Sequence, residues 1–174
     1  MVKATLRERA VRAYAELLVE QGQRAATLGA VAQRISSSKG GVLHHFASMQ
    51  VLGAALIAWF TDLAARDAER MREAPEGPVL FHLRTSADED PELKLALLAV
   101  TRLAMSHDAA ARQALKSAHE RWGDVLAETV ADPMAVRAIL LVATGLSASA
   151  DVGVDLISGV EALTDLRDWL IADD

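Results

Sequence analysis

The segment Ser36–Phe46 carries the side chains with the clearest chemical potential. Its sequence, SSSKGGVLHHF, combines three hydroxyls, a lysine and two glycines, which suit an anion, with adjacent histidines, which suggest a metal. Neighbouring residues on a helix project about 100° apart, so His44 and His45 are badly placed to share one ion. The segment also lacks the GxxxxGK[ST] order and the preceding strand of a nucleotide-binding loop. We expect neither a metal site nor a nucleotide site here.

Catalytic chemistry has no local trace elsewhere in the chain. His82, His107 and His119 are dispersed, and no serine lies in a GxSxG turn. The 174 residues include no cysteine, which excludes disulfides, thiolate zinc sites and a cysteine nucleophile. We therefore expect no enzyme, no cofactor and no bound metal.

Apolar periodicity predicts an all-α chain of about nine helices. A stripe from Leu6 to Leu18 indicates a helix over about residues 3–21, ended by Gly22. Thr27 is placed to cap a short second helix, and Ser38 to cap a third that reaches about Phe46. A fourth helix, capped by Ser48, spans about 48–73. The others are expected at about 79–85, 92–106, 109–131, 134–150 and 156–172.

Charge is distributed unevenly along the chain. The net charge is −6, yet residues 1–50 hold seven basic and three acidic side chains, a local net charge of +4. A basic end on an acidic body is the asymmetry expected when one end meets a polyanion. Together with the capped short helix, the three-residue turn and the polar start of the third helix, this predicts a helix-turn-helix that binds DNA.

In such a motif the third helix enters the major groove with its leading residues near bases and phosphates. Gly40 and Gly41 would let the backbone approach DNA closely, and Lys39 would add a full charge near a phosphate. Each glycine costs about 1 kcal/mol of helix stability relative to alanine, so some function should compensate for them.

At these residues the sequence resembles the DNA-binding domain of the TetR family of transcriptional regulators. The stretch from Thr27 to Leu52, TLGAVAQRISSSKGGVLHHFASMQVL, follows the family pattern, and SKGGVLHHF looks like the subgroup that has SKGGLLYHF. The resemblance implies an N-terminal three-helix DNA-binding domain (1–50), joined by the long fourth helix to a helical effector-binding and dimerisation domain (51–174).

The resemblance also implies the residues that face DNA. Thr27, Lys39 and His44 would lie mainly on phosphates, residues 38–42 near base edges, and Phe46 in the core. The full expected set is Thr27, Ser37, Ser38, Lys39, Gly40, Gly41, Val42, His44 and His45. The chain departs from the family pattern at four positions: Ser36 replaces a turn glycine, Ser37 an apolar residue, His44 a tyrosine and Met49 a lysine.

The C-terminal part suggests a small-molecule pocket and a dimer interface. Helical bundles bind small molecules between their helices, and apolar side chains available for this, or for ordinary core packing, are Trp59, Phe60, Phe81, His82, Met105, Trp122 and Met134. The segment AILLVATGLSA is apolar nearly all round, so it must be covered on more than one side. We expect residues 134–150 and 156–172 to form a homodimer interface.

The function expected is a ligand-responsive, homodimeric repressor that a small, apolar effector releases from a palindromic operator. The alternative is a helical protein-interaction module with a degenerate helix-turn-helix; Ser37 and Met49 motivate it. The N-terminus lacks a secretory signal, and the 17-residue run 134–150 falls short of the roughly 20 apolar residues of a membrane span. A cytoplasmic protein without a membrane partner is expected.

Overall fold

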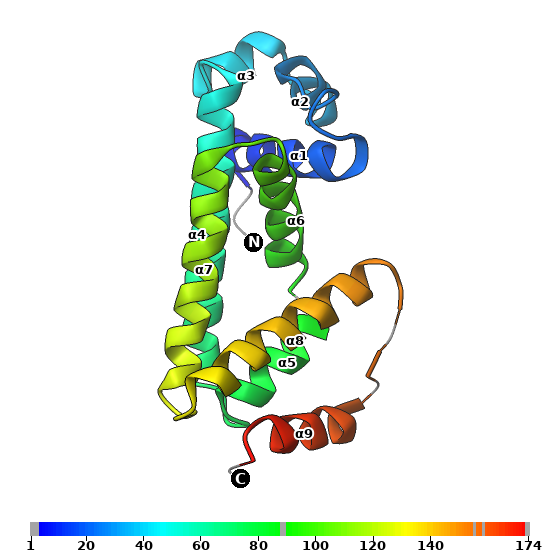
Figure 1. Cartoon of the computed structure of the whole chain (residues 1–174). Coiled ribbons are helices and arrows are strands. Elements are labelled where there is room, and N and C mark those ends of the chain that lie inside the picture. Colours follow the sequence, from blue (N-terminus) through cyan, green and yellow to red (C-terminus); the bar gives the residue numbers. More distant parts are fainter. Residues whose placement is uncertain (1–3, 88–89, 155, 158, 173–174) are drawn as a thin grey trace. The chain divides into compact units, whose positions relative to one another are not determined.

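The computed structural model describes residues 4–87, 90–154, 156–157 and 159–172, and every regular element within them is a helix (Figure 1). The helices are α1 (Leu6–Gln21), α2 (Leu28–Arg34), α3 (Lys39–His45), α4 (Met49–Arg72), α5 (Pro78–Ala87), α6 (Pro91–Met105), α7 (Ala109–Ala127), α8 (Pro133–Asp151) and α9 (Gly159–Leu170). This confirms the all-α fold and the expected order of helices.

Capping residues predict where the helices begin better than the apolar pattern does. Thr5 caps α1 by accepting a hydrogen bond from the Glu8 amide at 3.2 Å, so the helix begins later than the pattern indicates. Lys3 lies outside the described residues. The last helix also begins later than expected, at Gly159, whose φ of +87° is a conformation that glycine adopts without strain.

Contacts divide the chain into two compact units. The first unit contains the described residues up to Leu63 together with Pro91–Lys116, and the second contains Ala64–Asp90 and the described residues from Ser117 onward. The contacts thus group Pro91–Lys116 with the N-terminal helices, although the sequence analysis predicts that this segment belongs to the C-terminal domain. The functional division into 1–50 and 51–174 stays a prediction.

In the first unit α1 is the central element. It contacts α2, α3 and α6, while α2 also contacts α3. Phe46, predicted as core, is 1% exposed and immediately follows α3. Leu52 and Leu56, from the start of α4, are fully buried. Apolar burial of this kind holds α3 in place, because a helix of seven residues is not stable by itself.

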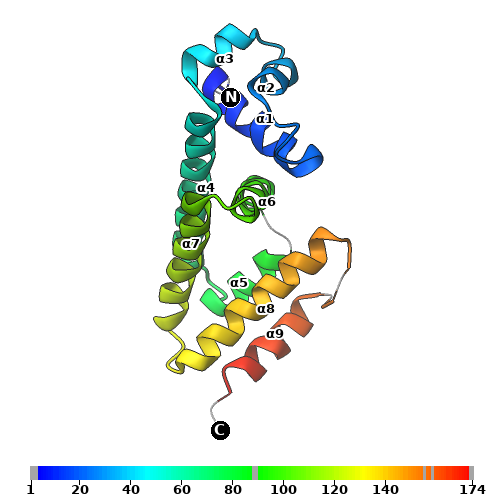
Figure 2. The same cartoon turned by 45° about the horizontal axis from the view of Figure 1, so that its top comes forward.

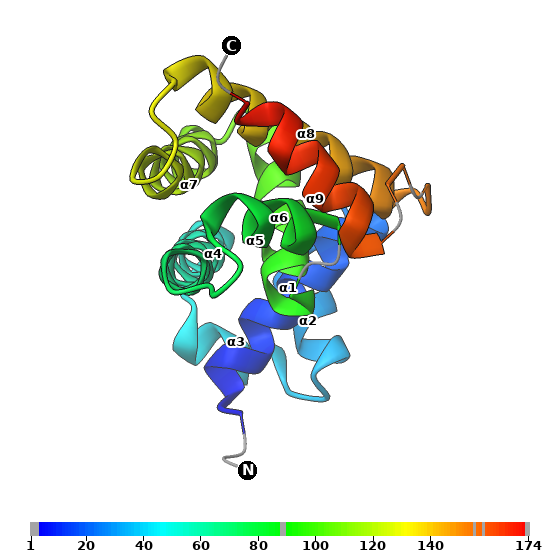
Figure 3. The same ribbon diagram turned by 90° about the horizontal axis from the view of Figure 1, so that it is seen from below.

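In the second unit α5 contacts both α8 and α9, and α8 lies beside α9 (Figures 2 and 3). One face of α8 is buried through Val136, Ile139, Ala143 and Leu146. The opposite face is apolar but exposed; Leu141 has 74% of its surface accessible. Asp132 caps α8 through bonds from two backbone amides, at 2.9 and 3.2 Å.

By length and composition alone, α8 is able to cross a bilayer. It spans 19 residues, more than the 17-residue apolar run seen in the sequence, and 22% of its most apolar window is buried. Among the described residues, α3 and α4 pass the same test only if they are taken together as one bent pair. Such a helix also suits a packed protein interface, because a helix that is apolar all round needs cover on several sides.

Candidate nucleic-acid interface

The second helix and the turn after it are built by local hydrogen bonds. The Thr27 hydroxyl accepts from the Ala30 amide at 3.2 Å, which confirms the predicted cap of α2. At the other end, the Ser36 amide donates to Gln33 O (3.1 Å) and the Ser37 amide to Ala32 O (2.9 Å). These two bonds form a Schellman motif, in which the residue at the position of Ser36 adopts a left-handed conformation and is usually glycine.

Two of the family departures occupy the key positions of this motif. Ser36 has φ +53°, a conformation that costs an L-residue about 1–2 kcal/mol. Ser37 follows at the position where an apolar side chain frequently packs back onto the helix. Ile35, 6% exposed, supplies apolar burial beside it. The turn therefore has the geometry of a helix-turn-helix, although Ser36 and Ser37 are residue types that stabilise this geometry poorly.

Replacing Ser36 with glycine should stabilise the protein. The gain from removing the left-handed strain is partly offset by the greater freedom of glycine in the unfolded chain, leaving roughly 0.5–1 kcal/mol. Urea unfolding followed by circular dichroism measures it. The matched control is Ser37→Gly, which relieves no left-handed strain and should destabilise. Equal losses in both variants would contradict the strain at Ser36.

The third helix begins with a second capping serine. The Ser38 hydroxyl accepts from the Gly41 amide at 3.0 Å, as its sequence position predicts. A Cβ added at Gly41 would lie 3.0 Å from Ser37 Oγ and 3.3 Å from Ser38 Oγ, whereas at Gly40 the nearest atom would be Ser38 Oγ at 3.9 Å. Packing within the chain thus accounts for Gly41. Packing within the chain does not account for Gly40.

Most of the expected DNA-facing residues are accessible. Thr27, Ser38, Lys39, Gly40, His44 and His45 are exposed, and Ser37 and Gly41 are half-buried. Val42 is the exception: it is fully buried, so its side chain packs in the core and does not reach a base edge. The position of Val42 within the leading turns predicts DNA contact, but its place on the inner face of α3 follows from tertiary packing.

Positive charge at this surface is scarcer than the count of basic residues implies. The Arg9 guanidinium donates to the carbonyl of Ile35, and that of Arg7 lies 5.8 Å from the centre of the Phe46 ring. Arg12 pairs with Glu16 at 3.3 Å, and Arg34 pairs with Glu20. Within the described part of the chain, Lys39 and Arg24 make no hydrogen bond or ion pair.

The sequence did not indicate these roles for the arginines. Only the Arg12–Glu16 pair has helical i, i+4 spacing that a sequence pattern can show. Arg9 and Ile35 are 26 residues apart, and Arg34 and Glu20 are 14 apart. These contacts exist only after α2 has folded against α1. The accessible cation that belongs to the leading edge of α3 is Lys39.

Three of the seven candidate pocket residues are buried in the second unit. Phe81, His82 and Trp122 are all buried, and the His82 and Trp122 rings lie 5.6 Å apart. Burial, followed by the nearby His119, lowers the pKa of His82 to about 4. Sequence reasoning missed Asp67, which is 4% exposed.

Asp67 is buried with partners. It accepts a hydrogen bond from Trp122 Nε1 at 3.1 Å and from Arg70 at 3.0 Å. Burial raises the pKa of its carboxyl group, and the Arg70 charge and the Trp122 bond act in the opposite direction. A charged carboxylate surrounded by apolar helices is kept only if such donors satisfy it.

The other candidate pocket residues are dispersed. Trp59, Phe60 and Met105 belong to the first unit, where Met105 is 68% exposed, and Met134 is 63% exposed on α8. A cavity of about 270 Å³ in the second unit includes none of the seven; its lining is Ala87, Leu146, Ser149, Ala150, Gly153, Val154, Leu156 and Ile157. The described residues contain no cluster of histidine and carboxylate side chains able to hold a metal.

A capped two-turn helix and a tight turn that present the leading edge of a third helix define a helix-turn-helix DNA-binding regulator of transcription. Residues 11–56 match the family described as bacterial regulatory proteins, tetR family, so the helix-turn-helix segment of this chain is similar to that of the TetR family. The subgroup suggested by SKGGVLHHF stays a prediction. No curated protein sequence matches the chain.

Solved structures share the whole fold. A TetR-family member from Streptomyces coelicolor A3 aligns with TM-score 0.74 and 19% identity, covering 98% of this chain and 100% of its own. GusR from Salmonella enterica aligns with TM-score 0.67 and 21% identity, covering 95% of both chains. The multidrug binding protein EbrR, solved with imidazole, aligns with TM-score 0.67 and 19% identity, covering 99% of this chain and 98% of its own.

Proposed function

We propose that this protein is a homodimeric repressor that binds a palindromic DNA operator and is released by a small molecule. The observation that carries the DNA-binding part is the accessible leading edge of α3, where Ser38, Lys39 and Gly40 are exposed directly after the turn that follows α2. Thr27, His44 and Lys39 contact phosphates, and Ser38, Gly40 and Gly41 lie near base edges. Val42 contributes through packing alone.

The homodimer forms through α8 and α9. Exposed on these helices are Met134, Leu141, Val160 and Trp169, and Trp169 has 75% of its surface accessible. Gly145 is exposed on α8, and a Cβ at this position would meet no atom within 4 Å, so another helix can approach closely there. Covering this face with a second copy removes apolar surface from water and places two recognition helices on one duplex.

Release by a ligand requires two spacings of the recognition helices. Successive major grooves on one face of DNA lie about 34–36 Å apart, so a dimer held at another spacing binds weakly. A molecule that binds the second unit better in that other spacing lowers DNA affinity by linkage. The cavity of about 270 Å³ in the second unit supports such a site, because its lining includes the apolar Leu146, Val154 and Ile157. A neighbour with this fold that is described as a multidrug binding protein supports a small-molecule effector.

The experiment that tests the proposal is selection of bound fragments from genomic DNA by the purified protein. An enriched palindrome, bound as a dimer and released by a small molecule, is the expected result. If no sequence is enriched and affinity for every duplex is equal, the chain is not an operator-binding repressor. A cytoplasmic location follows from this role.

Two substitutions test the assigned phosphate contacts. Lys39→Ala should weaken operator binding by about tenfold, because each protomer of the dimer loses a charge-assisted contact. His44→Ala should have a smaller effect in the same direction. Fluorescence anisotropy with the selected duplex measures both, and Lys94→Ala, a lysine outside the helix-turn-helix, is the control.

The alternative function, a helical protein-interaction module, makes the opposite prediction. In that case Lys39→Ala and His44→Ala leave the affinity for every duplex unchanged, and what weak binding exists does not depend on duplex sequence. This alternative is excluded if the wild-type protein binds DNA specifically and Lys39→Ala loses that binding.

A further inference from the structure

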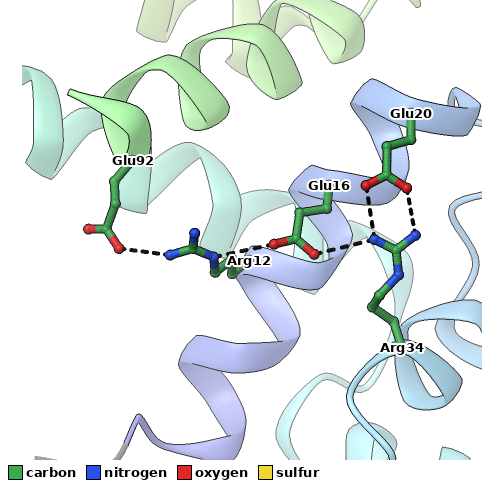
Figure 4. Close-up of polar contacts among 5 residues, drawn as sticks. All are labelled: Arg12, Glu16, Glu20, Arg34 and Glu92. Carbon is green, nitrogen blue, oxygen red and sulfur yellow. Dashed lines mark hydrogen bonds and ion pairs between the residues drawn. The ribbon is translucent and has the colours of Figure 1, made fainter. Parts of the chain in front are cut away.

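The turn between α2 and α3 is tied to α1 at two consecutive residues. The Arg34 guanidinium forms a two-bond pair with Glu20, at 3.1 and 2.7 Å, and also bonds to Glu16 at 3.3 Å (Figure 4). The next residue, Ile35, accepts a hydrogen bond on its carbonyl from Arg9. We name this set the turn clamp: Arg9, Glu16, Glu20 and Arg34, with the Ile35 carbonyl.

The turn held by the turn clamp has little stability of its own. Directly after Ile35 comes Ser36, with its left-handed φ of +53°, and then Ser37 in place of an apolar anchor. The helix that follows has seven residues, two of which are glycines in its first turn. Because short helices and glycines are both unfavourable, the direction of α3 depends on contacts from outside it.

Charge argues against DNA contact by Arg34. Figure 4 shows Arg12 joining Glu16 to Glu92, so that two arginines and three glutamates form one chain with a net charge of −1. Such a group does not attract a phosphate backbone. The hydrogen bond from Arg34 also lowers the pKa of Glu20, which keeps this carboxylate ionised.

We propose that the turn clamp positions the recognition helix, so that Arg9, Arg34 and the acidic Glu20 set DNA affinity without touching DNA. Glu20 is thus a positioning residue for DNA binding although its charge repels DNA. This inference rests on the proposed DNA-binding function. It assigns Glu20 a favourable role in DNA binding, although repulsion between its charge and the phosphates is unfavourable.

The turn clamp and long-range electrostatics predict opposite effects of Glu20→Gln on DNA affinity. Loss of a negative charge near DNA strengthens binding if only long-range electrostatics acts. The clamp predicts the reverse, a weakening of about threefold to tenfold, since the two-bond pair with Arg34 is lost. The salt dependence of the affinity should stay as steep as in the wild type, because no phosphate contact is removed.

Arg34→Lys is the second variant, and Glu73→Gln is the matched control for loss of an acidic charge outside the clamp. Lysine keeps the charge but not the planar fork, so affinity should fall with an unchanged salt slope. Tighter binding by Glu20→Gln, or unchanged affinity in both clamp variants, would overturn the proposal.

A readout without DNA keeps the clamp testable apart from the proposed function. Hydrogen exchange of the backbone amides from Ser36 to Val42 should be faster in Glu20→Gln than in the wild type, at a temperature where circular dichroism shows both fully folded. Equal exchange would contradict the clamp even if no duplex binds. If the wild type binds no duplex but exchange rises as expected, the function fails and the clamp stands.

Discussion

Leu141→Asp should convert the protein to a monomer and weaken operator binding at least about a hundredfold. Leu141 lies on the apolar face of α8 with 74% of its surface exposed in the single chain. In the proposed dimer this position is covered, so the variant would bury a carboxylate without a partner, at a cost of several kcal/mol. A monomer presents one recognition helix and loses the second half-site.

The control places the same charge elsewhere. Ala110→Asp adds a carboxylate at an exposed position of α7 and should leave the dimer intact. Light scattering coupled to size exclusion at micromolar concentration measures the mass, and anisotropy measures DNA affinity. A wild-type monomer under these conditions, or a Leu141→Asp dimer with unchanged DNA affinity, would rule out the α8 interface.

The second large effect expected is a pH dependence that His82 brings to folding. Its pKa is lowered to about 4 in the folded chain, from an ordinary 6.5. The unfolded chain therefore binds the proton more readily, so the neutral imidazole favours folding above about pH 6.5 and this contribution is lost as pH falls toward 4. The loss between pH 7 and pH 4.5 is about 2 kcal/mol, from the usual energy per pKa unit.

Asp67 acts in the opposite sense, because burial raises the pKa of its carboxyl group. The informative quantity is therefore the difference between the wild type and His82→Phe, which replaces the buried imidazole with an apolar ring. The variant should lose about 2 kcal/mol less than the wild type between pH 7 and pH 4.5 in urea unfolding. His45→Gln, at an exposed position, is the control; parallel profiles for wild type and His82→Phe would show that His82 is accessible to water.

Local sequence signals predicted the helices well, because caps and apolar stripes act within a few residues. Thr27 and Ser38 cap as expected, and Phe46 is core. The departures at Ser36 and Ser37 were visible in the sequence, yet their physical meaning emerged only with the Schellman motif and the φ of +53°. Strain at a turn depends on backbone geometry that residue types alone do not reveal.

Long-range contacts were not predictable in this way. Counting basic residues suggested a strongly basic end, but Arg9, Arg12 and Arg34 bind partners that become neighbours only in the folded unit. The role of Asp67 was not predicted, because the apolar pattern of a helix does not show that a carboxylate will accept a hydrogen bond from Trp122, 55 residues further on. The candidate interface was thus found from its motif, while its electrostatics required the fold.

The salt dependence of operator affinity in the wild type and in Lys39→Ala tests the central claim most directly. For a protein that contacts phosphates, the logarithm of the binding constant falls linearly with the logarithm of salt concentration. Lys39→Ala should lower that slope by about two, one contact from each protomer of the dimer, and weaken binding at low salt. An identical slope and affinity in the two proteins would contradict DNA recognition by the leading edge of α3.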